Sequence, residues 1–184
     1  MPLRLRSLTV FALALLASCA GGRRAADFTL VDDSGTPWRL SQQQGKTLLL
    51  TFGYTHCADT CPATLAKLVQ TARGLGSRSQ QLEIVFVTVD PRRDTPGALH
   101  RYIARFDRPG NGRLVALTGS ASHITAVENA YHVWSAAMPV RHGHYNVAHG
   151  AAIFLIDGAQ RLREVLDDQD SQASLTRAVN ALLG

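Results

Sequence analysis

Two cysteines, Cys57 and Cys61, follow directly after an apolar run, and a helical pattern begins after them. The run from Lys46 to Phe52 is short and apolar, which is typical of a buried strand. Pro62 opens a segment, extending to about Leu75, whose apolar residues recur at helical spacing. We therefore expect a strand, a loop that carries Cys57, and a helix with Cys61 at its start and Pro62 as its first residue.

This position favours reactive or metal-binding sulfurs. Unpaired N–H groups and the positive end of the helix dipole stabilise anions, so we expect the pKa of a thiol at the helix start to fall. A structural disulfide is the alternative, but a bridge closing about five residues stabilises by only ~2 kcal/mol, against ~4.7 kcal/mol for about a hundred residues. We interpret Cys57 and Cys61 as a redox-active pair, able to form a disulfide, or as metal ligands.

The beginning of the chain has the pattern of an export signal. Arg4 and Arg6 precede an apolar stretch from Leu8 to Ala17, which is too short for the roughly twenty helical residues that span a bilayer. Residues 16–19, Leu-Ala-Ser-Cys, resemble the bacterial lipobox, in which the cysteine becomes the lipid-modified N-terminus. The alternative is an ordinary cleaved signal that happens to contain Cys19.

These features predict the domain organisation and the location. We expect a lipoprotein-type signal peptide at 1–18, a tether at 19–26, and one domain at 27–184. Lipidation of Cys19 would anchor the protein in the membrane of a bacterial cell envelope, facing the periplasm or the outer surface. Because exported compartments are oxidising, the remaining cysteine pair needs a periplasmic thiol reductant as a partner.

Composition fits one globular domain and gives no sign of nucleic-acid binding. The chain has 184 residues, 46% of them hydrophobic and 18% charged, with a formal charge of +5. Removing Arg4 and Arg6 with the signal leaves 17 basic against 14 acidic residues, or +3. The arginines are scattered and no aromatic-interleaved basic patch appears, so we expect no nucleic-acid partner.

The rest of the chain alternates strands and helices. A hairpin is expected from Phe28–Val31 and Trp38–Leu40, and the β-rich run at 82–89 predicts a parallel strand after the cysteine helix. Asp90 would then lie near the thiols, because the carboxyl ends of parallel strands share one edge. Thr95 is expected to cap a helix that Pro96 opens.

Later elements follow the same pattern, with one exception. A strand is expected at Arg113–Leu117 and a helix start at Gly119–Ser122. From Trp134 to His149 the periodicity fails, which predicts an irregular, histidine-rich loop. We then expect a strand at 151–157, its hairpin partner at 161–166 and a closing helix at 171–183. This order is that of an α/β thioredoxin-like fold with an N-terminal hairpin and a histidine-containing loop insertion before a late strand.

Three segments together resemble the Sco/SenC family. They are Phe52–Pro62 (FGYTHCADTCP), Val87–Pro96 (VTVDPRRDTP) and a histidine just before a late strand. The resemblance covers about residues 27 to 184, and three motifs in order are far more specific than a C-x-x-x-C pair alone. It implies a thioredoxin-like, copper-binding protein that helps assemble the binuclear copper centre of cytochrome c oxidase.

Carried over residue by residue, the resemblance implies Cys57 and Cys61 as thiolate ligands and His149 as the imidazole ligand. The chain departs from the family at two positions. Ala58 follows the first cysteine, where proline is frequent, and Ala148 precedes the histidine, where aspartate is frequent. The first change should matter little, whereas the second removes a neighbouring charge of the kind that tunes a metal site.

The donor set suits copper and leaves alternatives open. Two thiolates and an imidazole suit Cu(I), and with a water or carboxylate added they suit Cu(II). Zinc is the closest competitor, because two cysteines and a histidine with an open fourth position also make catalytic zinc sites. From the pattern alone His142, His144 and His56 are also candidate ligands, and the resemblance favours His149. His142 and His144 are then auxiliary copper contacts or solvated, and Asp90 is a motif residue without a ligand role.

Two functions use the same sulfurs. The first is a metallochaperone that passes copper to the copper-site subunit of cytochrome c oxidase, with no turnover of a small substrate. The second is a thiol-disulfide oxidoreductase that reduces the oxidase copper-site cysteines or senses redox state. The histidine separates them, because thiol exchange needs no imidazole about ninety residues downstream. Peroxidase-like chemistry is a weaker third reading, since a histidine ligand describes a metal site better than a peroxide pocket.

Overall fold

The structure is a computed structural model, and it describes residues 22–106, 112–140 and 145–183. The expected signal peptide, Cys19, His142 and His144 lie outside the described residues. Within the described part of the chain, no helix is both long enough and apolar enough to cross a membrane.

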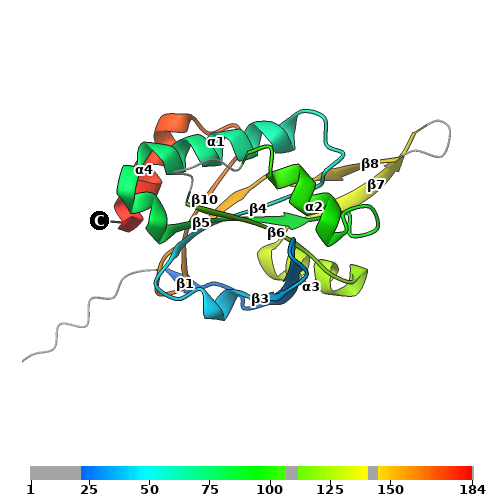
Figure 1. Cartoon of the computed structure of the whole chain (residues 1–184), viewed down its shortest axis with the longest axis horizontal. Coiled ribbons are helices and arrows are strands. Elements are labelled where there is room, and N and C mark those ends of the chain that lie inside the picture. The colour runs from blue at the N-terminus through cyan, green and yellow to red at the C-terminus, as the bar shows by residue number, and fades with distance from the viewer. Residues whose placement is uncertain (1–21, 107–111, 141–144, 184) are drawn as a thin grey trace, which may run out of the picture.

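An eight-stranded mixed sheet runs through the domain, with α1 and α4 together on one face and α3 on the other (Figure 1). Its strand order is β1-β10-β9-β4-β5-β6-β2-β3, and β7 and β8 form a separate two-stranded sheet. The strands are β1 (Arg23–Arg24), β2 (Thr29–Asp32), β3 (Pro37–Arg39), β4 (Thr47–Gly53), β5 (Leu82–Thr88), β6 (Arg113–Thr118), β7 (Ser135–Pro139), β8 (Tyr145–His149), β9 (Ile153–Ile156) and β10 (Arg161–Leu166). The helices are α1 (Thr60–Gly74), α2 (Pro96–Ile103), α3 (Ala121–Tyr131) and α4 (Gln172–Leu183), with 3-10 turns at Leu40–Gln42 and Gly76–Gln81.

The centre of the sheet confirms the predicted strand–helix–strand unit. β4 and β5 are parallel along their whole length, from Thr47 opposite Leu82 to Gly53 opposite Thr88. Every residue of both strands is buried, because the sheet is covered on both faces. This explains why both strands appear in the sequence as continuous apolar runs rather than as alternating patterns.

The predicted flanking elements are also confirmed. β2 and β3 make the N-terminal hairpin, and β9 and β10 make the closing hairpin before α4. The Thr95 side chain caps α2 by accepting a hydrogen bond from the N–H of Ala98 at 3.3 Å, and Pro96 is the first helical residue. Ser120 caps α3 in the same way, through the N–H of His123 at 3.2 Å.

Two predicted boundaries are wrong. α1 begins at Thr60 rather than at Pro62, which is its third residue. Proline is tolerated there because the N–H groups of a first helical turn have no partner within the helix. Arg23 and Arg24, placed in a tether by the sequence analysis, pair with β10, and Ala25 is buried after them.

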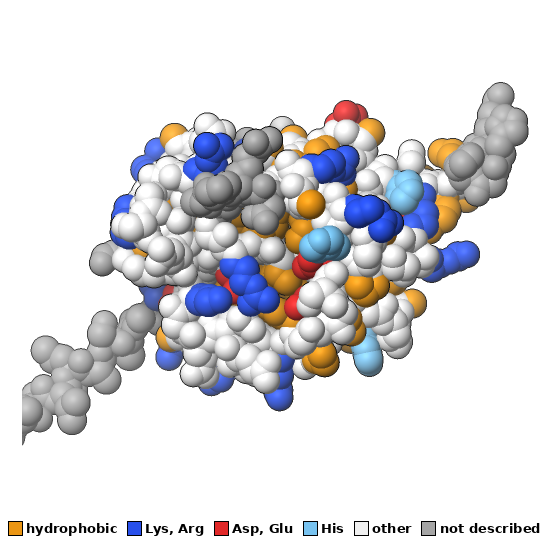
Figure 2. Space-filling view, in the orientation of Figure 1, with side chains coloured by type: hydrophobic (Ala, Val, Ile, Leu, Met, Phe, Trp, Pro, Cys, Tyr) orange, Lys and Arg blue, Asp and Glu red, His pale blue; other side chains and the backbone are white. Residues whose placement is uncertain are grey.

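The prediction of an irregular loop from Trp134 to His149 is also wrong, since β7 and β8 form an antiparallel hairpin arm that extends to one end of the molecule (Figure 1). Most of β7 is exposed, so its sequence lacks the alternation that marks a half-buried strand. Three large apolar side chains on or beside this arm are exposed, namely Trp134, Met138 and Val140. Figure 2 shows hydrophobic surface along the arm.

Candidate metal centre

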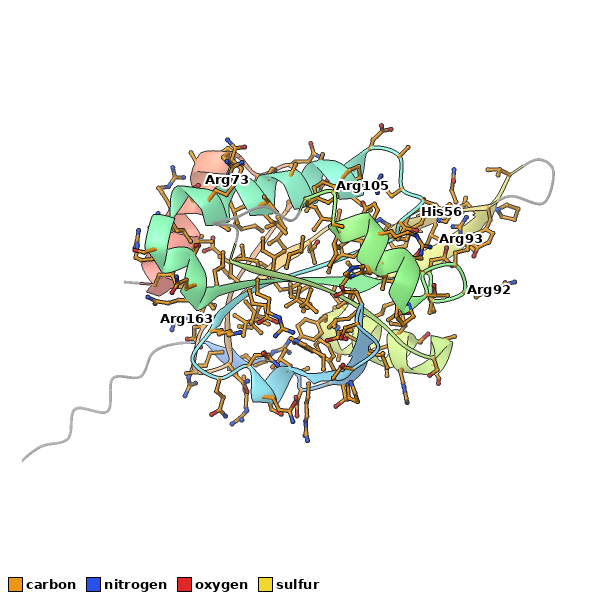
Figure 3. The ribbon with its side chains drawn as sticks, viewed as in Figure 1. His56, Arg73, Arg92, Arg93, Arg105 and Arg163 are labelled. Carbon is orange, nitrogen blue, oxygen red and sulfur yellow. The ribbon has the colours of Figure 1, made fainter. Side chains whose placement is uncertain are left out.

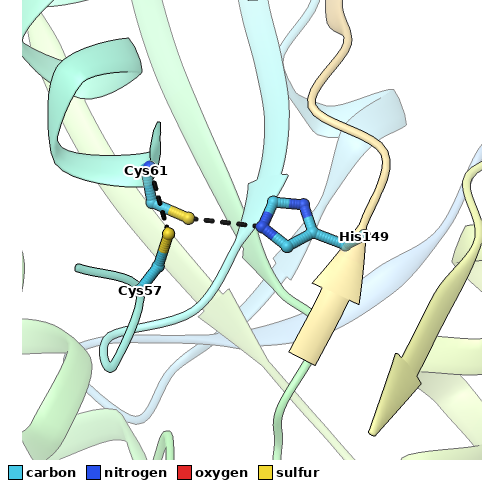
Figure 4. Close-up of side chains that lie close together, drawn as sticks. All are labelled: Cys57, Cys61 and His149. Carbon is cyan, nitrogen blue, oxygen red and sulfur yellow. Dashed lines mark hydrogen bonds between the residues drawn. The ribbon is translucent and has the colours of Figure 1, made fainter. Parts of the chain in front are cut away.

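Cys57, Cys61 and His149 come together from three separate elements (Figure 4). Cys57 lies in the loop after β4, Cys61 is the second residue of α1, and His149 is the last residue of β8. One ligand atom of each residue lies within 4.8 Å of the others. Among the described residues, this is the sole group of three or more cysteine, histidine or acidic side chains placed to hold a metal ion.

The start of α1 directs its amide toward the first cysteine. The N–H of Cys61 donates to the Sγ of Cys57 at 3.3 Å, and the N–H of Cys57 donates to the carbonyl oxygen of Tyr54 at 3.2 Å. Both cysteines are free thiols in this structure. Cys57 is partly exposed, whereas Cys61 is 3% exposed, so the two sulfurs differ in access.

The expected fall in thiol pKa at the helix start is not found at Cys61. Burial raises the pKa of the Cys61 thiol above its ordinary value, and its hydrogen bond with Cys57 and the negative charges of Cys57 and Asp94 act in the same direction. The helix start cannot offset this, because Cys61 is turned into the core. The raised pKa favours the protonated thiol of Cys61 in the metal-free protein.

His149 presents a defined nitrogen to the sulfurs. Its Nδ1 lies 2.9 Å from the carbonyl oxygen of Gly150, which can only accept, so Nδ1 carries the proton. The Nε2 is left with a free lone pair and lies 3.4 Å from the Sγ of Cys61. The Tyr54 ring stands nearly perpendicular to the imidazole, at 88° with 5.8 Å between ring centroids. The arrangement suits metal ligation through Nε2.

A buried carboxylate that sequence reasoning missed holds the cysteine loop. Asp94 is fully buried and accepts hydrogen bonds from the N–H of Thr55 at 3.0 Å and from its hydroxyl at 2.6 Å. The hydroxyl of Thr88 donates to the same carboxylate at 2.6 Å. The motif that contains Asp94 was visible in the sequence, but the partner of each acidic residue was not.

Close packing at the end of β4 also positions Cys61. A Cβ atom added to Gly53 would lie 2.8 Å from the Sγ of Cys61 and 2.6 Å from a ring carbon of Phe86. Contacts that short require one of the neighbours to move. Gly53 is therefore required for the approach of Cys61 to the strand.

The other predicted residues lie elsewhere. His56 is exposed, and its Nδ1 lies 3.0 Å from the hydroxyl of Thr55 rather than with the ligand group. Asp90 is buried and pairs with Arg93 and Tyr145. Two sulfurs and one imidazole nitrogen are donor atoms that both Cu(I) and zinc accept, so the donor set alone does not choose between these metals.

The fold and this Cys-Cys-His group define a thioredoxin-like protein in which a histidine joins the cysteine pair, in an arrangement that could hold a metal ion. The SCO1/SenC family model matches residues 19–184, and the chain belongs to that family. Over 71% of the chain it is 41% identical to a mitochondrial SCO2 homolog of Bos taurus, of which the match covers 48%. It is 32% identical to an SCO2-like protein of Rickettsia conorii over 71% of the chain and 63% of that protein. The chain spans about half the length of the mammalian relatives it matches.

Solved structures agree with this assignment. Copper-bound ScoI of Bradyrhizobium japonicum superposes with a TM-score of 0.77 at 30% identity, covering 86% of this chain and 99% of that one. Copper-bound yeast Sco1 superposes with a TM-score of 0.72 at 27% identity, covering 86% and 90%. The thioredoxin-like fold expected from the sequence is thereby confirmed.

Proposed function

We propose that this protein binds copper through Cys57, Cys61 and His149 and delivers it to the copper-site subunit of cytochrome c oxidase. The observation that carries the proposal is the convergence of two sulfurs and one imidazole nitrogen within 4.8 Å. Membership of the SCO1/SenC family and copper-bound relatives of the same fold support copper as the metal. Copper is then the cargo of an assembly factor for the binuclear copper centre.

The three ligands contribute different properties. Cys57 is the more exposed sulfur and makes the first contact with arriving metal. Cys61 gives up its proton as the metal binds, because a bound cation offsets the cost of a buried thiolate. His149 completes the set through Nε2. Within the described residues no fourth histidine, cysteine or carboxylate joins the group, which fits three-coordinate Cu(I) and argues against a structural zinc site with four protein ligands.

His149→Ala tests this proposal against thiol exchange alone. Cu(I) affinity, measured with a competing chelator, should fall by at least about 10-fold to 100-fold, the loss that even indirect changes at metal sites cause. The rate of disulfide reduction should stay within error, because exchange depends on thiolate fraction and access. His123→Ala, an exposed histidine on α3, is the matched control and should change neither.

Restoration of oxidase activity in cells that lack the protein completes the experiment. If the protein delivers copper through this site, neither His149→Ala nor Cys57→Ser should restore oxidase activity. If His149→Ala restores the oxidase fully while Cys57→Ser does not, copper delivery through this site is the wrong account.

A thiol-disulfide oxidoreductase is the second candidate, favoured by the unequal access of the sulfurs. The Cys57 thiolate would attack a client disulfide, forming a mixed disulfide and releasing one client thiolate. Cys61 would then lose its proton and attack the Cys57 sulfur, forming the Cys57–Cys61 disulfide and releasing the second client thiolate. A periplasmic thiol reductant would restore the pair.

We also propose that the domain is held at a bacterial membrane by lipid on Cys19. The lipobox-like pattern at 16–19 supports this location. Each buried methylene contributes ~0.8 kcal/mol, and more than one chain is needed for stable anchoring. Cys19→Ala should release the protein from membranes, and the intact mass of the mature chain should include acyl groups. A mature mass without them would remove the anchor.

A further inference from the structure

His149 is carried by a strand that the main sheet does not hold. β8 pairs only with β7 in the described part of the chain, and neither strand has a ladder to the eight-stranded sheet. Three residues, 150–152, join His149 to β9, which pairs with β4, so the last residue of β8 is tied to the main sheet through the chain. The first residue of β8, Tyr145, lies at the other end of the strand and depends on side-chain contacts. We propose that Arg93 is the positioning residue that holds β8, and with it His149, in place for metal binding. The inference rests on the proposed function and adds a residue outside the ligand set.

Arg93 is joined to β8 by two direct contacts and by a third that runs through Asp90. Its Nη1 donates to the backbone carbonyl oxygen of Tyr145, the first residue of β8, at 2.9 Å. The centre of its guanidinium group lies 3.7 Å from the centroid of the Tyr145 ring, within cation–π range. Its Nε forms an ion pair with Asp90, which also accepts a hydrogen bond from the Tyr145 hydroxyl at 2.7 Å. Arg93, Asp90 and Tyr145 thus form a closed cluster.

The same guanidinium group also reaches the cysteine side. It lies 5.6 Å from the centroid of the Tyr54 ring, and Tyr54 in turn packs edge-on against the imidazole of His149. Tyr54 directly follows β4, and its carbonyl oxygen accepts the N–H of Cys57. Arg93 therefore lies against Tyr54, beside the cysteine loop, and against Tyr145, in the strand that carries His149, and it does not contact the three ligands.

Burial makes this cluster rigid and selective for arginine. Asp90 is 3% exposed, and its ion pair with Arg93 offsets part of the cost of burying a carboxylate. The Nη2 of Arg93 is buried without a hydrogen-bond partner in the described structure, a cost that only the group's other contacts can offset. Lysine could keep the charge but could not stack and donate from one planar group.

The preceding residue, Arg92, offers a matched control. Arg92 and Arg93 both lie at the end of the molecule that carries the β7–β8 arm (Figure 3). Arg92 is exposed and makes no hydrogen bond or ion pair with another described residue. Arg92→Met and Arg93→Met therefore remove the same charge from neighbouring positions, and only one of them breaks the cluster.

Amide hydrogen exchange of the metal-free protein is the decisive measurement. Arg93→Met should speed exchange of residues 145–149 by about tenfold or more, as expected for loss of a buried ion pair, while β4 and β5 keep their protection. Cu(I) affinity should fall by about tenfold in the same variant. Arg92→Met should match the wild type in both. Equal exchange of 145–149 in the wild type and Arg93→Met would overturn the proposal, even if copper affinity fell.

Two milder variants guard against misfolding of Arg93→Met. Arg93→Lys and Tyr145→Phe should each fold and give faster exchange of residues 145–149 than the wild type, with a smaller loss of Cu(I) affinity. If both leave exchange and affinity at wild-type values, the positioning role is wrong. Because exchange is measured without metal, this outcome is separate from a failure of copper delivery, which the His149→Ala and Cys57→Ser rescue assay reports.

Discussion

The two sides of the metal centre are built in different ways. The sulfur side grows from the centre of the main sheet, where β4 is paired with β5 and β9 and leads directly into the cysteine loop and α1. The imidazole side is the end of an arm with a two-stranded sheet of its own. The two sulfurs are fixed by backbone pairing and core packing, whereas the imidazole is held by the short link from His149 to β9 and by side-chain contacts along β8.

Because of this difference, a substitution can affect stability and metal affinity together on one side and metal affinity alone on the other. A change near the sulfurs disturbs tightly packed atoms, so it should lower the free energy of unfolding and the metal affinity together. A change on the arm should move the imidazole while the core stays intact.

The largest effect is expected from a matched pair of glycine substitutions. Gly53→Ala on the sulfur side would push Cβ against the Cys61 sulfur and the Phe86 ring, costing about 3 kcal/mol of unfolding free energy. Gly150→Ala on the imidazole side meets nothing closer than 3.8 Å, from Trp134, and keeps the carbonyl that His149 uses. It should change stability by less than about 0.5 kcal/mol.

Denaturant unfolding of the metal-free proteins measures this pair, and chelator competition measures their Cu(I) affinity. Gly53→Ala should be defective in both measurements. Equal stability of the two variants would show that the sulfur side is not more tightly packed than the imidazole side.

The next effect concerns the carboxylate beneath the cysteine loop. Asp94→Asn replaces an acceptor of three hydrogen bonds with a group that must donate as well, leaving a buried polar group unpaired. The expected cost is about 1–3 kcal/mol, with faster amide exchange at 55–57. Asp59→Asn is the matched control, because Asp59 is exposed and its side chain makes no capping hydrogen bond. Similar losses in both variants would contradict the assignment.

Sequence patterns predicted the sulfur side well because its residues follow strong local rules. The buried parallel strands are continuous apolar runs, and Thr95 with Pro96 marks a helix start. Cys57 and Cys61 lie at the predicted turn. The fall in pKa expected at Cys61 was wrong because a helix start is a local feature, whereas burial depends on which way the side chain faces.

The imidazole side was predicted only in part. The resemblance selected His149, but β7 is mostly exposed and β8 mostly half-buried, and neither shows an alternating pattern, so they resemble a loop in sequence. The roles of Arg93 and Asp94 depend on partners 39 to 52 residues away in the chain, and spacing alone does not identify such pairs.

A smaller effect is expected in the chemical labelling of the two thiols. In the reduced, metal-free protein Cys57 is partly exposed, whereas Cys61 is buried and burial raises its pKa. Because the thiolate is the reactive form, iodoacetamide at pH 8 should modify Cys57 at least about tenfold faster than Cys61. Peptide mass spectrometry over a time course measures the ratio, and the Cys61 rate should rise as pH rises. Equal rates at pH 8 would show that Cys61 is not sequestered.

The smallest effect is expected at Tyr102, whose ring packs against Phe86 on the sulfur side, 5.6 Å between centroids. Burial and then the nearby cysteine charges raise its pKa, and among the described residues its hydroxyl has no hydrogen-bond partner. The folded state therefore holds the proton of the Tyr102 hydroxyl more tightly than the unfolded chain, in which the pKa of tyrosine is about 10. Above pH ~10 the unfolded chain releases the proton first, so the free energy of unfolding falls as pH rises.

Tyr102→Phe removes that contribution. At pH 7 its stability should lie within about 1 kcal/mol of the wild type, because a buried hydroxyl without a partner contributes little. Between pH 9 and pH 11 the variant should lose less stability than the wild type does. Tyr131→Phe is the contrast: its hydroxyl donates to the carbonyl oxygen of Ala26 at 2.9 Å, so the variant should lose about 1 kcal/mol at pH 7. If Tyr102→Phe is instead the more damaging change at pH 7, the hydroxyl has a partner on the sulfur side, and that side is held by more than packing.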